Sequence, residues 1–354
     1  MDRRTGLWGF LFCCAVVLSG RSLAQTPLPA AASSAEQDHA HALELAASGN
    51  DTGAGAWFRK AWEEDPAETR YVHDLAVYYI HHHQYSDALA VIRDCVKRLG
   101  PTAVAWTLQG ELLFEEKDYD SAYQSLRSAL DLSNVNYRAH ELIGLIFSIH
   151  RRYGLALEEL KIAAEQNPGS AQVRFYCGRL YYRSANYTSA LDELLACLKL
   201  QPAYPEALEN LGLAYEAMGD LASATTEYRK AIDLEKAGKT PSSELPYVCL
   251  GVLLSRQSGD QEAPLLLREA VVKNPNSAWA NFELGRLYFK AGQDALAERH
   301  LKRSAELDKS YSRPHFFLGK IYARSGRHPE AKAEFAHFQE LDKETDNREP
   351  QLTR

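Results

Sequence analysis

Small residues recur every 34 positions along most of this chain. Gly285 and Gly319 are 34 residues apart, and the same step leads from Gly212 back to Gly178. The one irregular step, from Gly212 to Gly251, is longer by five residues. A fixed period of this length predicts a solenoid, in which short repeated units bury their apolar faces against their neighbours. The residues of this series are Ala42, Ala76, Gly110, Gly144, Gly178, Gly212, Gly251, Gly285 and Gly319.

A second series of small residues follows the first. If the first series is position 8 of each unit, every unit has alanine at position 20. Positions 4, 7, 8 and 11 share one face of an α-helix, so each unit is predicted to be two helices that approach closely at their small residues. Proline at position 32 of several units cannot continue the second helix. The alanines are Ala54, Ala88, Ala122, Ala156, Ala190, Ala224, Ala263, Ala297 and Ala331, and the prolines are Pro66, Pro168, Pro202 and Pro275.

One unit shows the full pattern. It carries Leu284, Gly285, Tyr288 and Ala297 at positions 7, 8, 11 and 20, and the next unit repeats the same four residue types. This pattern resembles the tetratricopeptide repeat (TPR) family over residues 35–345. The resemblance implies an all-α TPR solenoid, a right-handed superhelix of nine antiparallel helix hairpins. The expected units are residues 35–68, 69–102, 103–136, 137–170, 171–204, 205–238, 244–277, 278–311 and 312–345, with an insertion at 239–243.

The first 24 residues have the features of a secretory signal peptide. Arg3 and Arg4 precede an apolar run over residues 7–18, and Ser22 and Ala24 are small residues before an expected cleavage site. The run is too short for a membrane span, although an uncleaved anchor is the alternative. Residues 25–34 are expected to form a flexible linker and residues 346–354 a polar tail. We therefore expect an exported protein, located in a bacterial periplasm or secreted.

The sequence offers no chemistry for catalysis. It contains no phosphate-binding loop, dinucleotide turn, nucleophile elbow or HExxH motif, so we expect neither an enzyme nor a cofactor. His39 and His73 share position 5 in adjacent units and could face each other, and His81 begins a run of three histidines. Ligands of a metal site must converge, whereas consecutive histidines on a helix fan apart. We therefore expect polar, solvated histidines and no metal.

Charge and cysteine content restrict the partners. The net charge is −7 and would fall to about −9 without residues 1–24, which argues against a general nucleic-acid-binding surface. Cys95, Cys177 and Cys197 fall at core positions of their units, where free cysteines serve as small apolar residues. A disulfide between Cys177 and Cys197 is the alternative in an oxidising compartment.

Two places interrupt the regular array. The insertion at 239–243 is either a hinge between units one to six and units seven to nine or a longer surface loop. The last unit has Phe338 where the family usually has alanine. That ring either caps the end of the array itself or marks an edge that docks a partner or a second copy of the chain.

The resemblance implies that positions 2, 5, 9, 12 and 13 line a concave groove that binds partner segments. In units eight and nine these positions are aromatic or cationic, whereas unit six has Glu206, Glu209 and Glu216 there. Aromatic and arginine side chains are enriched at binding hot spots, and a basic groove suits an acidic–hydrophobic peptide or a free carboxylate. The predicted groove residues are Phe175, Arg179, Tyr182, Arg183, Trp279, Phe282, Arg286, Phe289, Lys290, Arg313, Phe316, Lys320 and Arg324.

These features predict a non-enzymatic adaptor or scaffold that holds an extended segment of a partner protein, with no nucleic-acid partner and no membrane span after signal cleavage. The alternative is an accessory subunit of envelope polymer assembly or export. In that case the aromatic and cationic groove would bind an anionic polysaccharide.

Overall fold

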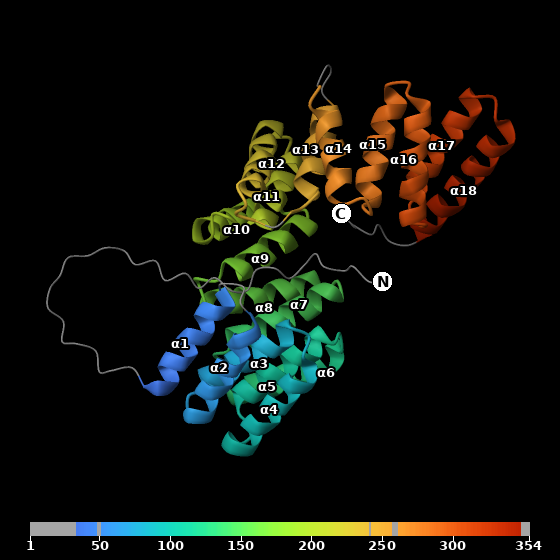
Figure 1. The fold of residues 1–354 in the computed structure, drawn as a ribbon. Helices are drawn as coiled ribbons and strands as arrows, with labels where there is room; N and C mark the ends of the chain where they lie inside the picture. The colour runs from blue at the N-terminus through green and yellow to red at the C-terminus, as the bar shows by residue number, and fades with distance from the viewer. Residues whose placement is uncertain (1–32, 48–50, 241, 257–260, 348–354) are drawn as a thin grey trace, which may run out of the picture. The chain divides into compact units, whose positions relative to one another are not determined.

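The computed structural model describes residues 33–47, 51–240, 242–256 and 261–347 (Figure 1). Within these ranges all regular structure is α-helical and comprises eighteen helices. The expected signal peptide, nearly all of the expected linker and residues 348–354 of the expected tail lie outside the described residues. Residues 346 and 347, which were expected to belong to the polar tail, instead end the last helix.

Successive helices form antiparallel pairs, as the 34-residue period predicts. The helices are α1 (Ser34–Ala47), α2 (Asp51–Glu64), α3 (Thr69–His81), α4 (Tyr85–Leu99), α5 (Ala103–Glu115), α6 (Tyr119–Leu132), α7 (Tyr137–Ile149), α8 (Tyr153–Gln166), α9 (Ala171–Arg183), α10 (Tyr187–Leu200), α11 (Pro205–Ala217), α12 (Leu221–Lys236), α13 (Leu245–Ser255), α14 (Ala263–Lys273), α15 (Ala278–Lys290), α16 (Asp294–Leu307), α17 (Ser312–Arg324) and α18 (His328–Asn347).

The small residues hold each pair together. A Cβ atom on Gly178 of α9 would lie 2.6 Å from Cγ of Leu194 and 3.3 Å from the carbonyl oxygen of Ala190, both on α10. Only glycine permits so close an approach, and Ala190 is itself fully buried. The two small-residue series therefore mark the contact line of the hairpins, which is why they keep the period.

Polar side chains fix where the helices begin. Ser170 Oγ accepts a hydrogen bond from the Val173 backbone N–H at 3.2 Å, and Asn186 Oδ1 accepts one from Ser189 at 3.3 Å. These bonds satisfy donors that the first helical turn leaves free. Between the two helices Ala185 adopts φ 57°, a left-handed conformation that closes the short turn.

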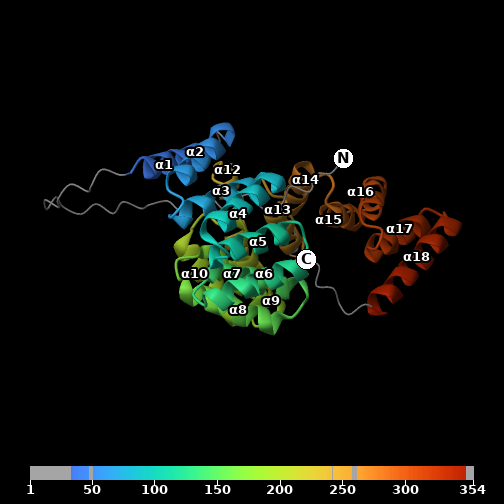
Figure 2. The same cartoon turned by 90° about the horizontal axis from the view of Figure 1, so that it is seen from below.

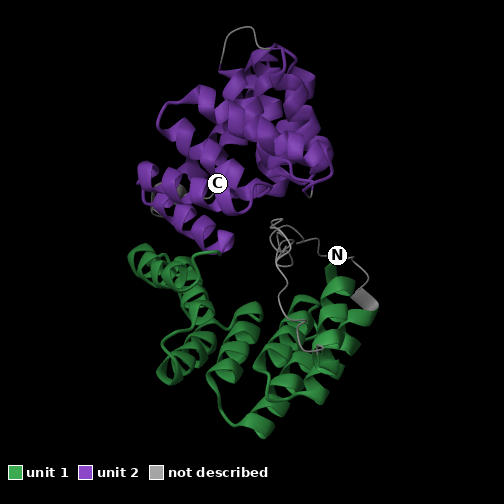
Figure 3. Cartoon of the chain, turned by 90° about the vertical axis from the view of Figure 1, so that its left-hand side faces the viewer, with its two compact units in different colours: residues 1–169 green, residues 170–354 purple. Residues whose placement is uncertain are grey.

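The chain divides into two compact units, residues 1–169 and residues 170–354 (Figure 3). We call them the N-terminal unit and the C-terminal unit. In the N-terminal unit one core cluster extends from Ala35 on α1 to Leu112 on α5. In the C-terminal unit a core cluster extends from Ala224 on α12 to Ala331 on α18, and each of the hairpins α15–α16 and α17–α18 packs on its neighbour (Figure 2).

The core of the C-terminal unit runs across the insertion at 239–243. Ile232 and Tyr247, on either side of it, belong to the same buried cluster. Glu244, at the start of α13, accepts a hydrogen bond from Asn274 Nδ2 at the end of α14 at 2.8 Å, within the hairpin that follows the insertion. The division into units falls between Gly169 and Ser170 instead. The hinge proposed for 239–243 therefore has a continuous core beneath it.

The last helix supports the self-capping alternative for Phe338. Phe338 is half-buried, and its ring centroid lies 5.4 Å from that of Phe316 on α17. Phe335 packs against the core of the C-terminal unit and fills the space over Gly319. Both rings of α18 thus pack within the last hairpin.

Candidate partner-binding groove on the first helices

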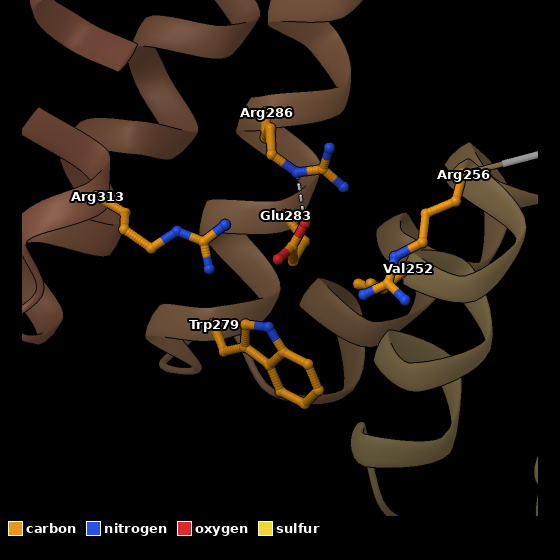
Figure 4. Close-up of a pocket in the computed structure, with 6 residues that line it drawn as sticks. All are labelled: Val252, Arg256, Trp279, Glu283, Arg286 and Arg313. Carbon is orange, nitrogen blue, oxygen red and sulfur yellow. Dashed lines mark hydrogen bonds and ion pairs between the residues drawn. The ribbon is translucent and has the colours of Figure 1, made fainter. Parts of the chain in front are cut away.

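The first helices of three successive hairpins, α13, α15 and α17, share one cavity of about 160 Å³ (Figure 4). Its lining contains three arginines, one tryptophan and one carboxylate. We call it the arginine pocket. It is lined by Val252, Arg256, Trp279, Glu283, Arg286 and Arg313.

Glu283 is the buried acid of the arginine pocket. Its side chain is 5% exposed and accepts a hydrogen bond from Arg286 Nε at 2.7 Å. Arg286 Nη2 also donates to Ser255 Oγ on α13 at 3.2 Å. A buried carboxylate is stable only with such a cationic partner, so Glu283 holds the Arg286 guanidinium in place.

The other two guanidinium groups are held differently. Arg256 Nη1 donates to Glu216 Oε1 on α11 at 2.7 Å, so a carboxylate outside the lining offsets its charge. Arg313 lies on the ring of Phe282, with Cζ 4.7 Å from the ring centroid, and has no carboxylate partner in the described part of the chain. The lining itself therefore carries three positive charges and one negative charge.

Cations also lie on aromatic rings elsewhere along the predicted groove. Lys320 Nζ is 4.3 Å from the centroid of the Phe316 ring, and Arg324 Cζ is 4.6 Å from that of Phe289. Arg324 additionally forms an ion pair with Asp294. Such stacking stabilises a cation while its hydrogen-bond donors stay available at the ring edge. The structure thus brings together the two residue types that the sequence pattern placed in one groove.

Two predicted groove residues are core residues. Phe282 is 0% exposed and Phe175 is 6% exposed, so neither ring is free to contact a partner as predicted. The ring of Phe282 packs 5.0 Å from that of Tyr311, which immediately precedes α17, and 5.8 Å from that of Phe317 on α17. Instead of contacting a partner, the Phe282 ring packs against Arg313 and the Phe175 ring packs against Arg179.

The remaining predicted residues divide into two groups. Trp279, Arg286 and Arg313 meet in the arginine pocket, while Lys290 is exposed and donates to the Ser255 carbonyl at 3.4 Å. Tyr182, Arg183 and Arg179 lie on α9, apart from this pocket. Burial lowers the pKa of Arg179, and the neighbouring charge of Arg183 lowers it further. Arg179 rests on two rings, those of Phe175 and Tyr176, each 5.4 Å away.

Comparison with protein families decides the class of the chain. A family described as "TPR repeat" matches residues 178–219, and two described as "Tetratricopeptide repeat" match residues 205–237 and residues 73–137 and 282–342. The matches fall in both compact units. The chain is a tetratricopeptide repeat protein.

Individual TPR proteins resemble it over part of their length. The BBSome complex member bbs-4 of Caenorhabditis elegans is 25% identical over 199 residues, which are 56% of this chain and 42% of that protein. Heat shock protein STI1 of Saccharomyces cerevisiae is 35% identical over 72 residues, 19% of this chain and 12% of that protein. The chain thus spans less than half the length of these relatives.

Solved structures confirm the fold. The crystal structure of the APC/C hetero-tetramer Cut9-Hcn1 superposes with a TM-score of 0.66 at 18% identity and covers 81% of this chain and 56% of that chain. Yeast Tom70 superposes with a TM-score of 0.51 at 17% identity and covers 86% of this chain and 67% of that chain. At these identities the likeness concerns the TPR fold.

TPR position numbers explain which pocket residues sequence reasoning missed. Arg256 is at position 13 of its unit and Val252 at position 9, and both are groove positions. Glu283 is at position 6, which was not among the groove positions considered. Val252 and Arg256 belong to the unit at residues 244–277, from which no groove residue was predicted although both lie at groove positions, whereas the burial of Glu283 depends on contacts from other hairpins.

The acids predicted on unit six are not one exposed acidic surface. Glu209 on α11 is 6% exposed and accepts a hydrogen bond from Ser243 Oγ at 3.3 Å. Burial raises the pKa of Glu209 to about 8, the charge of Glu206 raises it as well, the Ser243 hydroxyl opposes the shift, and the charge of Glu244 adds to it. Glu216 is engaged by Arg256. Two of these three acids, Glu209 and Glu216, therefore already have partners within the chain.

The N-terminal unit holds a buried ion cluster that the sequence did not reveal. Arg138 on α7 pairs with Glu111 on α5 and with Glu141, the latter at 3.0 Å. Both glutamates are 2% exposed. Glu111 is at position 9 of one first helix and Arg138 at position 2 of the next, so neighbouring first helices bring them together.

The histidines and cysteines also differ from expectation. His39 is buried, not solvated, and Asp74 accepts hydrogen bonds from His39 Nε2 at 2.7 Å and from His73 Nδ1 at 2.9 Å. Among the described residues no group of three or more potential ligands converges on a metal position. Cys177 and Cys197 are buried and are not joined in a disulfide, contrary to the alternative considered for them. None of the described helices combines the length and the apolar composition needed to cross a bilayer.

Proposed function

We propose that this TPR protein is a non-enzymatic scaffold that holds an extended segment of a partner protein against the first helices of its C-terminal unit. The arginine pocket carries the proposal. It places three guanidinium groups around one small cavity, in a chain whose net charge is −7. A local concentration of positive charge against the overall balance favours an acidic or carboxylate-bearing partner.

The comparisons support the coarser part of this proposal. The resembling proteins include a member of the BBSome complex and Tom70, and the Cut9-Hcn1 structure is itself a hetero-tetramer. Binding to other proteins is therefore the expected role of such an array. The aromatic and cationic composition of α15 and α17 supports the finer assignment of the binding surface.

Export is the second part of the proposal. Its basis is the sequence of residues 1–24, where two arginines precede an apolar run and small residues follow it. Expression of the full chain in a bacterial host, followed by fractionation and N-terminal sequencing, tests it. A mature protein that begins at Gln25 in the periplasmic fraction is the expected result, and an uncleaved chain in the cytoplasmic fraction would exclude export.

Affinity capture from the envelope fraction of the source organism tests the binding role. The variant Arg313→Glu/Lys320→Glu reverses two cations that have no carboxylate partner among the described residues and so leaves no buried acid unpaired. The matched control Arg299→Glu/Lys309→Glu makes the same charge change at exposed residues of α16 and the loop after it. Circular dichroism checks that all three proteins are folded.

A partner captured by wild type and control but lost from the groove variant is the expected outcome. Equal capture by all three proteins would place binding elsewhere. If an anionic polysaccharide is retained in place of a protein, the alternative role in envelope polymer assembly or export replaces the adaptor role.

A further inference from the structure

The N-terminal unit has an excess of carboxylates around Arg138. We propose that the C-terminal ends of α3 and α5 form a binding site for the ammonium group of a lysine side chain from a partner protein. We call it the ammonium site. It uses none of the residues of the arginine pocket, so it goes beyond the function proposed for the C-terminal unit and does not depend on it.

The acids of this cluster outnumber its cations. Arg138 on α7 pairs with Glu111 on α5 and with Glu141 on its own helix. Glu115 lies one turn after Glu111 on α5, and its side chain has no ion pair or hydrogen bond within the described ranges. Burial raises the pKa of Glu115, the charge of Glu111 raises it further, and Arg138 and His83 oppose the shift. Three carboxylates thus surround one guanidinium group.

One oxygen of each buried glutamate lacks a hydrogen-bond donor. Glu111 and Glu141 are each 2% exposed, and neither Glu111 Oε2 nor Glu141 Oε1 has a hydrogen-bond partner in the part of the chain that the structure describes. A buried carboxylate with too few donors is destabilised, because burial has removed its hydration. An additional positive charge beside Glu111 is therefore stabilised by the whole cluster and not by Glu115 alone.

The ends of two helices favour a cation at the same place. Glu115 is the last residue of α5 and His81 the last residue of α3, and these two first helices pack on each other. The C-terminal end of a helix carries a partial negative charge, so a carboxylate there is unfavourable and a cation is favourable. Glu115 is half-buried, so a side chain from outside can reach it where part of the water is already excluded.

His81 favours an ammonium group as the cation. It is half-buried, and burial lowers its pKa, an effect that the charge of Glu111 only partly offsets. The imidazole is therefore neutral at pH 7 and offers a ring nitrogen as an acceptor. An ammonium group has three donors that can point to separate acceptors such as Glu115 and His81, whereas a guanidinium group presents a planar fork. A lysine side chain is thus the cation that this arrangement suits.

The test uses the full chain and three pools of octapeptides that carry a neutral fluorescent label. The pools have blocked ends and random uncharged residues around one fixed central residue, which is lysine, Nε-acetyl-lysine or arginine. Fluorescence polarisation at pH 7.5 measures binding. We expect the lysine pool to bind about tenfold better than the acetyl-lysine pool, because acetylation removes the charge and two of the three donors. The arginine pool should bind more weakly than the lysine pool.

Two neighbouring glutamates give a matched pair of variants. Glu115→Gln keeps the size of the side chain and removes its charge, and Glu116→Gln makes the same change at the exposed residue that follows. Glu115→Gln should lose the preference for lysine and have a higher Tm than wild type, because the repulsion between Glu111 and Glu115 is removed. Glu116→Gln should keep both the preference and the Tm of wild type. A Tm of Glu115→Gln below that of wild type would show that Glu115 stabilises the fold, and the inference would then fail.

The outcomes separate this inference from the proposed function. The ammonium site is overturned if the lysine and acetyl-lysine pools bind equally, if neither binds, if the arginine pool binds as well as the lysine pool, or if the lysine preference survives Glu115→Gln. If capture from the envelope fraction still depends on Arg313 and Lys320 in these cases, the scaffold role stands without the ammonium site. If the lysine preference depends on Glu115 but capture does not depend on Arg313 and Lys320, the ammonium site stands and the binding surface proposed for the C-terminal unit is wrong.

Discussion

Glu209 should make the stability of the C-terminal unit depend on pH in an unusual direction. The pKa of this buried carboxyl is about 8, against an ordinary value of 4.5. Between these two pH values the folded chain keeps a proton that the unfolded chain has released. Stability is therefore greatest below pH 4.5, falls as the pH rises toward 8 and then levels off, which is the reverse of the usual behaviour of a paired carboxylate.

The expected size follows from the linkage of proton binding to folding. One pKa unit corresponds to about 1.4 kcal/mol, so the free energy of unfolding should fall by about 2.5 kcal/mol between pH 5 and pH 7 and by about 1.5 kcal/mol more by pH 9. The variant Glu209→Gln keeps the shape of the side chain and cannot ionise. Its advantage over wild type should therefore grow with pH. At about 2–4 °C per kcal/mol for a unit of this size, the change from pH 5 to pH 7 corresponds to about 5–10 °C in Tm.

Thermal unfolding at pH 5, 7 and 9, followed by circular dichroism, measures this effect. Glu306→Gln is the matched control, because Glu306 is exposed on α16 and the substitution makes the same chemical change. The difference in Tm between Glu209→Gln and wild type should rise with pH, and that for Glu306→Gln should stay flat. A difference for Glu209→Gln that is the same at all three pH values would refute the reasoning, since it would mean that Glu209 ionises normally in the folded chain.

Three further predictions concern packing and buried charge. Arg138→Met should destabilise the N-terminal unit by about 3–5 kcal/mol, because it leaves two buried carboxylates without their shared cation, and urea unfolding measures the loss. Asp74→Asn should lower the free energy of unfolding by about 2 kcal/mol at pH 7. The reason is that burial would raise the pKa of Asp74, but hydrogen bonds from two histidines outweigh this effect and lower the pKa to about 2. The difference in free energy of unfolding between Asp74→Asn and wild type should disappear as the pH falls from about 4 to 2. A difference that does not depend on pH would contradict this account. Gly178→Val should cost about 1–3 kcal/mol through overpacking against Leu194, and Leu194→Ala in the same chain should recover part of the loss in Tm.

The hairpins were predictable from the sequence because their decisive contacts are local. Gly178 meets Leu194 only sixteen positions away, within one unit, and the same pair of positions recurs along the array. A contact that repeats at a fixed separation leaves a visible period in the sequence. Positions 2, 9 and 13 likewise lie at fixed angles on the first helix, so the aromatic and cationic residues there were visible in the sequence, while their role in binding a partner stays a prediction.

Burial of individual groove residues was not predictable, because it depends on side chains from the next hairpin. Phe282 is covered by Tyr311 at the end of its own unit and by Phe317 on α17 of the next unit, and these contacts appear only once the two hairpins are packed. The ion cluster around Arg138 likewise joins side chains from two neighbouring units. The insertion at 239–243 appears in the sequence only as a shift of the 34-residue period. The burial of Ile232 and Tyr247 in one cluster, on either side of the insertion, is visible only in the packed structure of α12 and α13.

Phe282 is both a core residue and the support of a predicted groove residue. One of its faces supports the Arg313 guanidinium, while the ring itself belongs to the core. The guanidinium is therefore restricted before any ligand arrives, and less side-chain entropy is lost when it binds one. A substitution such as Phe282→Leu would keep an apolar core and release the arginine. Under the proposed function, binding would then weaken through a core residue that the partner does not touch.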